Sequence, residues 1–108
     1  MKVLDYEPYV FHLLEDGEAL YLSAFCSHSA FDYIVLIRMN PAEVADYRKK
    51  GRRFLMKLAG DIQYSAPAAR GSRSPFGPRN LTLGRGEESL RAEAATEAWD
   101  AEQAGSGS

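Results

Sequence analysis

The first third of the chain consists of short apolar runs in which side-chain character alternates, separated by turn residues. Runs at 8–15, 20–26 and 31–39 are rich in β-branched and aromatic residues and have the length of strands. A Glu-Asp-Gly turn separates the first two runs, and a Ser-His-Ser sequence at 27–29 separates the second from the third. The pattern predicts an antiparallel sheet of three or more strands.

Both faces of this predicted sheet are apolar. Because side chains alternate along a strand, the second run places Leu20, Leu22, Ala24 and Cys26 on one face and Tyr21, Ser23 and Phe25 on the other. A sheet with one solvated face has a regular polar row, and here that row is missing or interrupted. We therefore expect both faces to be covered by helices, by a long loop or by a second copy of the chain across a two-fold axis.

A helix start follows the third run. Asn40 has the character of an N-cap, Pro41 suits the first helical position, and Glu43 completes a capping box. Apolar residues then recur with helical spacing at Val44, Tyr47, Phe54, Leu55, Leu58 and Ile62. We expect one long amphipathic helix packed on the sheet, with Gly51 on its apolar stripe permitting a close approach.

The remaining chain predicts an arm and a second helix. Residues 65–86 are rich in Pro, Gly and Arg and form a long arm, in which residues 80–83 have the character of a short edge strand. Residues 87–103 have high helix propensity and acidic residues in the first turn. The apolar stripe of this peripheral helix contains Leu90, Ala94, Ala98 and Trp99, with Trp99 as its anchor. Residues 104–108 read as a flexible tail.

The composition is that of one globular domain. The chain has 108 residues, of which 45% are hydrophobic and 26% charged, and we assign residues 1–103 to a single α+β domain. The single Cys26 excludes an internal disulfide. Because no apolar run is long enough to cross a bilayer, we expect a cytoplasmic protein without a membrane partner.

Charge is segregated along the chain. The formal net charge is -2, yet the ten residues 48–57 carry six cations. Residues 1–47 hold eight acidic and two basic side chains, residues 48–85 ten basic and one acidic, and residues 86–108 six acidic and one basic. This pattern fits a solvated helix face, an acidic protein partner, a nucleic-acid partner, or attraction between segments of one chain or of two protomers.

Helical geometry places the cations on the outer face of the long helix. At about 100° per residue, Lys49, Lys50, Arg53 and Lys57 point away from the apolar stripe, and Arg48 and Arg52 flank it. The candidate partner-binding residues are Arg48, Lys49, Arg52, Arg53 and Lys57 in the helix and Arg70, Arg73 and Arg79 in the arm. The acidic residues Glu93, Glu97 and Asp100 are placed to meet this face within the same chain or in a neighbour.

These features favour a non-enzymatic interaction protein that forms a homodimer and binds an acidic protein surface. The alternative is a nucleic-acid-binding module that uses the basic helix and the arm. Against this alternative, the sequence has no helix-turn-helix, zinc-finger, KH or RNP pattern. Phe76 is the only aromatic residue among the arginines of the arm, whereas single-strand binding uses several.

Candidate catalytic chemistry is sparse. Cys26 and His28 are near each other in the sequence, and Asp32 is the nearest acid that could orient the imidazole. A buried thiol and a polar connection between strands explain these residues without catalysis. A small hydrolase or transferase using Cys26 or His28 is the third hypothesis. We assign no catalytic, cofactor-binding or metal-ligating residues, because the spacing of a zinc site and a glycine-rich phosphate loop are both lacking.

Three short stretches carry a resemblance to a known group of proteins: CSHSAF at 26–31, IQYSAP at 62–67 and RNL at 79–81. Together with the capped helix they resemble a group of small bacterial proteins of unknown function, over about residues 20–100. The resemblance implies a one-domain bacterial α+β protein from toxin-immunity neighbourhoods, and it supplies no catalytic residues or mechanism.

Overall fold

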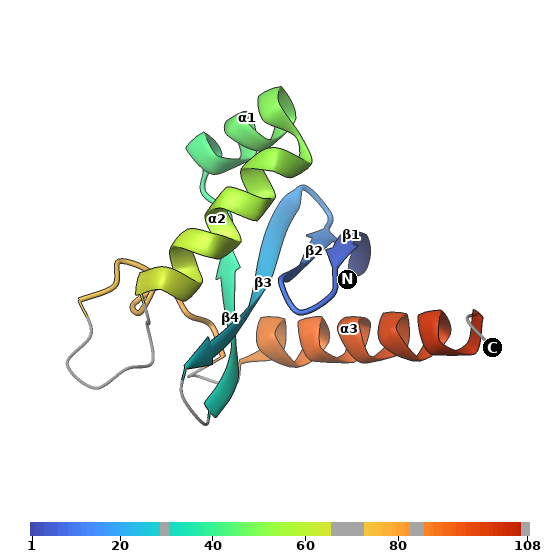
Figure 1. Cartoon of the computed structure of the whole chain (residues 1–108). Coiled ribbons are helices and arrows are strands. Elements are labelled where there is room, and N and C mark those ends of the chain that lie inside the picture. The colour runs from blue at the N-terminus through green and yellow to red at the C-terminus, as the bar shows by residue number, and fades with distance from the viewer. Residues whose placement is uncertain (29–30, 66–72, 83–85, 107–108) are drawn as a thin grey trace.

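The computed structural model describes residues 1–28, 31–65, 73–82 and 86–106, which have the α+β architecture predicted from the sequence. One antiparallel sheet has the strand order β1-β2-β3-β4, formed by β1 (Lys2–Glu7), β2 (Phe11–Asp16), β3 (Ala19–His28) and β4 (Phe31–Arg38). The helices are α1 (Pro41–Lys50), α2 (Arg52–Ser65) and α3 (Glu87–Ser106). Helices α1 and α2 lie on one side of the sheet and α3 on the other (Figure 1). Over the described ranges, no helix combines the length and apolarity needed to cross a membrane.

The three predicted strands are present as β2, β3 and β4, and β1 is a fourth that the sequence pattern did not reveal. Strand β1 carries three charged residues and is interrupted by a bulge between Val3 and Asp5, so its alternation is weak. Residues 8–10, which the sequence assigns to the first strand, form the turn before β2. Tyr9 of this turn has a φ of 61°, a value rarely adopted by residues other than glycine.

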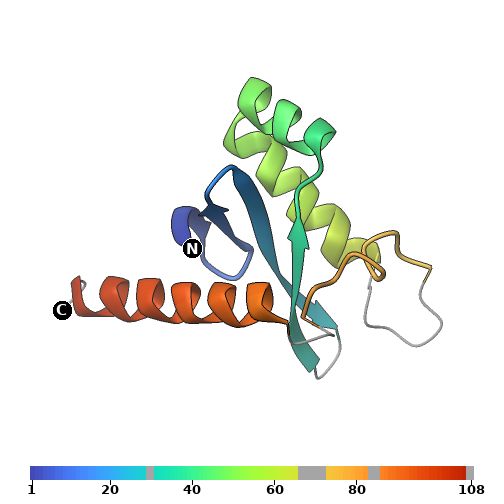
Figure 2. The same cartoon turned by 180° about the vertical axis from the view of Figure 1, so that it is seen from behind.

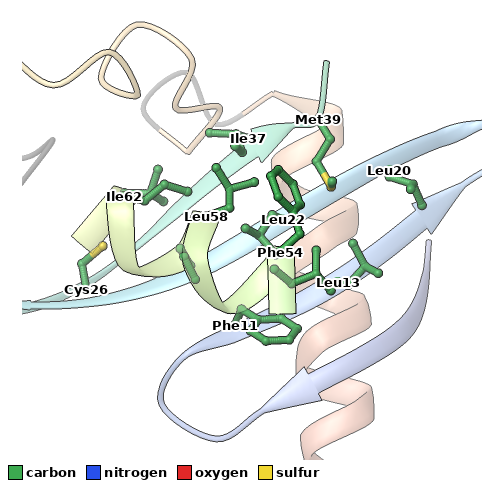
Figure 3. Packing of buried hydrophobic residues seen from close by; sticks show 14 residues of the cluster. Phe11, Leu13, Leu20, Leu22, Cys26, Ile37, Met39, Phe54, Leu58 and Ile62 are labelled. Atoms are coloured by element: carbon green, nitrogen blue, oxygen red, sulfur yellow. The ribbon is translucent and has the colours of Figure 1, made fainter. Parts of the chain in front are cut away.

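The first face of the sheet carries the larger apolar core. Leu22 of β3 pairs with Leu13 of β2 and with Ile37 of β4, and all three side chains are fully buried. Helix α2 covers this face with Phe54, Leu55, Leu58, Ala59 and Ile62 (Figure 3). Each fully buried side chain of this size contributes about 1.5–3 kcal/mol through removal of apolar surface from water. This core fixes the direction of α2 and therefore the position of its cations.

The predicted capping box is confirmed at the start of α1. The Glu43 backbone N–H donates to Asn40 Oδ1 at 2.8 Å, and the Asn40 backbone N–H donates to Glu43 Oε1 at 2.9 Å. The prediction of one uninterrupted helix is wrong, because the chain breaks at Gly51 into α1 and α2. Gly51 has a φ of 68° and a ψ of -144°, and its N–H caps the carbonyl of Tyr47 at 2.6 Å. A Cβ at Gly51 would meet nothing within 4 Å, so the expected close approach to the sheet is also wrong.

Gly51→Ala is expected to lower the free energy of unfolding by about 1 kcal/mol or more, because a side chain is strained at this backbone conformation. Gly60→Ala is the matched control. Gly60 lies inside α2 with ordinary helical φ and with open space around its Cβ position, so the same change should raise stability by about 0.5–1 kcal/mol. Urea unfolding of the two variants tests the prediction, and equal effects at both positions would contradict it.

The second face of the sheet is covered by α3. Leu14, Tyr21 and Leu36 form a smaller core with Ala92, which is 4% exposed. The apolar stripe predicted for this helix is wrong at Leu90, which is 48% exposed, and at Ala94 and Ala98, which are also exposed. Only Trp99 of that stripe is partly buried, and its ring meets Tyr6 edge-on with centroids 6.3 Å apart. Both faces of the sheet are therefore covered by helices of one chain.

The described part of the arm follows the outer edge of β4. Residues 80–82 form a turn rather than the expected strand, and residue 83 lies outside the described ranges. They nevertheless occupy the edge, because the Leu81 N–H donates to the Leu36 carbonyl at 2.8 Å. In return, the Leu36 N–H donates to Asn80 Oδ1 at 3.2 Å. Phe76 packs against the larger core.

Candidate functional site

Cys26 lies in the larger core and is completely buried. Burial raises the pKa of its thiol to about 11, so the thiolate needed for nucleophilic attack is scarce at neutral pH. The side chain of His28 is outside the described residues, and Asp32 is exposed. No cluster of three or more His, Cys, Asp and Glu side chains suited to a metal ion occurs within the described ranges. Cys26 and Asp32 therefore show no arrangement suited to nucleophilic catalysis, and a role for His28 stays a prediction.

Four exposed cations gather where α1 ends and α2 begins, and we call them the basic corner: Arg48, Lys49, Lys50 and Arg53. The glycine break places the last turn of α1 next to the first turn of α2. None of the four takes part in an ion pair in the described structure. Unpaired, exposed charges of one sign at one place form a surface suited to an anionic partner. Lys50 is a member that the sequence placed on the outer face but not among the candidate binding residues.

Arg52 and Lys57, also predicted to bind a partner, are already paired. The Arg52 guanidinium donates to Asp5 at 3.0 Å, to the carboxylate of Glu7, and to the Tyr6 carbonyl at 3.3 Å. It thus ties the start of α2 to β1. Lys57 Nζ lies 2.9 Å from Asp61 Oδ2 in an exposed pair one helical turn apart. Their role in binding a partner stays a prediction.

The three arginines of the arm have different positions. Arg79 is held by Glu43, with Nη2 2.6 Å from Oε1, and it also donates to the Arg38 carbonyl at 2.9 Å. Arg73 is exposed, and Arg70 lies outside the described residues. The structure therefore does not gather these three arginines with the basic corner. Arg79 instead anchors the arm to the start of α1.

Polar contacts hold α3 on the second face, far from the basic helices of its own chain. Tyr21 Oη donates to Glu88 at 2.5 Å, Arg91 pairs with Asp16 at 2.6 Å, and His12 Nε2 lies 2.9 Å from Asp100 Oδ1. Burial and the bond to Glu88 raise the pKa of Tyr21, while the bond from Arg91 lowers the pKa of Asp16. The sequence-based option that α3 meets the basic helices within one chain is wrong, because the sheet lies between them.

An open groove of about 510 Å³ lies between α3 and the sheet, and we call it the acidic groove. Its floor consists of His12, Ser23, Ile34 and Leu36, and its wall includes Leu90, Glu93, Thr96, Glu97 and Asp100 of α3. Ile34 is 43% exposed, so the floor presents apolar surface to solvent. Glu93 and Glu97 have no ion-pair partner in the described structure. The groove therefore combines an apolar floor with a negatively charged wall.

Sequence reasoning did not find this groove. The groove exists because a particular side of α3 faces the sheet. The sequence of α3 is rich in alanine and has no strong apolar stripe that would predict which side this is. The available signal is the spacing of Glu93, Glu97 and Asp100, which places the three carboxylates along one flank of a helix.

Comparison with protein-family models, with curated proteins and with solved structures found no significant match for this chain. The resemblance to small bacterial proteins therefore stays a prediction, and any proposal about function depends on the two charged surfaces.

Proposed function

We propose that this protein is a non-enzymatic interaction module that binds an acidic protein surface through the basic corner. The observation that supports the proposal is the group of four exposed cations at the α1–α2 junction that have no acidic partner in the described structure. A helix face that served only for solvation would gain from acidic residues interspersed among the cations. The other cations of α2 are neutralised in this way, by Asp5, Glu7 and Asp61.

Nucleic-acid binding is the second candidate, because the same cations suit phosphate groups. The side chains beside the corner favour a protein partner. Met56, one helical turn from Arg53, is 40% exposed. Leu4 lines a hollow that it shares with Arg48 and with Glu15 and Glu18, neither of which forms an ion pair with Arg48 in the described structure. Apolar groups among charged ones are typical of protein interfaces, whereas single-stranded nucleic acids need aromatic stacking surfaces.

The Arg48→Glu/Arg53→Glu variant is expected to bind a labelled glutamate-rich helical peptide at least about tenfold more weakly than the wild type, since each reversal replaces attraction by repulsion. Fluorescence anisotropy at low salt measures the change. Lys2→Glu is the control, because Lys2 is an exposed cation of β1 that belongs neither to the corner nor to the predicted binding residues. Equal binding by the wild type and the corner variant would contradict the proposal.

The same titration with a DNA duplex separates the two candidates. If four cations contact phosphates, a fourfold increase in salt should weaken duplex binding by roughly a hundredfold. We expect duplex binding weaker than peptide binding at moderate salt. Tighter duplex binding with this steep salt dependence, lost in the corner variant, would support the nucleic-acid function instead.

A further inference from the structure

We infer that the acidic surface bound by the basic corner is the acidic groove of a second copy of this chain. Two copies would then form a closed dimer with a two-fold axis beside β1. This inference rests on the proposed function, because it names the partner of the same corner. It also gives the homodimer expected from the sequence a different basis, since α3 already covers the second face of the sheet.

The two charged surfaces lie on opposite sides of β1. On one side, Arg52 at the start of α2 donates to the Tyr6 carbonyl at 3.3 Å. On the other side, the ring of Tyr6 meets Trp99 of α3, with centroids 6.3 Å apart. From Asp100 to Ala104 the side chains of α3 are exposed. The sheet thus prevents the basic corner from reaching the acidic groove of its own chain.

One end of the acidic groove and the basic corner are both close to β1. His12 of the groove pairs with Tyr6, and Arg52, next to the corner, is paired with Asp5 and Glu7. In Figure 1 the junction of α1 and α2 is above β1, and α3 runs below the sheet and projects past β1. Figure 2 shows the same projection from behind. A two-fold axis beside β1, perpendicular to the view of Figure 1, exchanges the upper and lower sides. If the acidic groove of each copy meets the basic corner of the other across this axis, each contact occurs twice and assembly stops at two copies.

The two surfaces are complementary in charge and both include apolar side chains. The corner is cationic, with Leu4 and Met56 beside it, while the groove is anionic and exposes Ile34 and Leu90. A standard interface buries about 800 Å² of each partner, roughly a tenth of the 6952 Å² that this chain exposes. In a two-fold dimer each copy contributes both its basic corner and its acidic groove to the interface. The buried area is therefore the sum of the two surfaces, and neither needs to reach about 800 Å² alone. A second copy is therefore the occupant that matches both surfaces at once.

Size-exclusion chromatography with light scattering tests the inference directly. The measured mass of the wild type is expected to rise to that of a dimer as its concentration is increased to about 500 µM. Added salt should return the mass toward that of a monomer, because it screens the charged contacts. Arg48→Glu/Arg53→Glu and Glu93→Lys/Glu97→Lys should each raise the dimer dissociation constant at least about tenfold, because like charges then meet in both contacts. Glu87→Lys reverses an exposed charge outside both surfaces and should keep the wild-type mass.

An equimolar mixture of the two double variants gives the sharpest result. In the mixed dimer each contact again joins opposite charges, so the dimer mass should return although neither variant dimerises alone. Circular dichroism and thermal unfolding show that each variant is folded before mixing. A mixture that stays monomeric would overturn the inference, because the corner and the groove would then not be partners.

Other outcomes are also decisive. A wild type that stays monomeric up to the highest concentration overturns the second copy as partner, while corner-dependent binding of the glutamate-rich peptide would leave the proposed function in place. A dimer that neither double reversal weakens is formed by another surface and also overturns the inference. If a monomeric wild type binds a designed leucine–lysine helix, and Glu93→Lys/Glu97→Lys abolishes this binding, the groove receives a basic segment of a different protein.

Discussion

Leu55→Ala is expected to lower the free energy of unfolding by about 3 kcal/mol, the largest effect that we predict for a single substitution. Leu55 is 0% exposed and lies in α2 against the first face of the sheet, within the larger core. Truncation removes buried apolar surface and leaves a cavity that rigid strands on one side cannot fill. Urea unfolding followed by circular dichroism measures the change.

Met56→Ala is the matched control for this prediction. Met56 is the next residue of the same helix but is 40% exposed, so its loss should change the free energy of unfolding by no more than about 0.5 kcal/mol. Leu and Met have similar helix propensities, so the change to Ala alters helix propensity by a similar amount at both positions. A small effect at Leu55, or equal effects at the two positions, would show that α2 does not pack on the sheet through this face.

Much of the fold was predictable because its signals are local. The alternation of the second and third strands and the turns between them require only nearest neighbours in the sequence. The capping box at Asn40 and Glu43 is contained in four residues, and the structure has both of its hydrogen bonds. Apolar side chains on both faces of the sheet correctly indicated that both faces are covered.

The errors arose where a local pattern is compatible with two structures. A glycine on an apolar helical stripe is compatible with a continuous helix and with a helix break. In the structure the backbone of Gly51 has a φ of 68°, which is not helical, so the helix ends there. In α3, alanine occurs on several sides of the helix, so no strong stripe specifies which side packs. Contact with Tyr21 and Leu36 selects Ala92, and Leu90 is consequently left exposed.

The candidate site was predictable as a concentration of charge but not as a surface. From the sequence, three of the four corner cations were predicted to bind a partner. Lys50 was placed on the outer face of the helix but was not among the predicted binding residues. The sequence did not distinguish paired from unpaired cations, because Arg52 and Arg79 find their acids in segments that are distant in the sequence. The acidic groove requires the orientation of α3 and the order of the strands together, neither of which is a local property.

Glu43→Gln is expected to lower the free energy of unfolding by about 2 kcal/mol at neutral pH, since charge-assisted hydrogen bonds contribute about 1.5–3 kcal/mol. The Glu43 side chain is 14% exposed and receives two hydrogen bonds from the Arg79 guanidinium, at 2.6 and 3.0 Å. Glutamine keeps the shape and the capping bond from the Asn40 N–H but removes the charge. Asp61→Asn, in the exposed pair with Lys57, is the control and should cost no more than about 0.5 kcal/mol.

The pH dependence of this difference tests its electrostatic origin. Burial alone would raise the pKa of Glu43, but the bonds from Arg79 and from the Asn40 N–H outweigh it and hold the pKa below the ordinary value of 4.5. The stabilisation is therefore fully present above pH 4.5 and is lost as the pH falls through the lowered pKa of the folded state. The stability gap between the wild type and Glu43→Gln should consequently close in acid while Arg79 remains charged. A gap that persists unchanged down to about pH 2 would mean that shape, rather than the carboxylate charge, fixes the arm to α1.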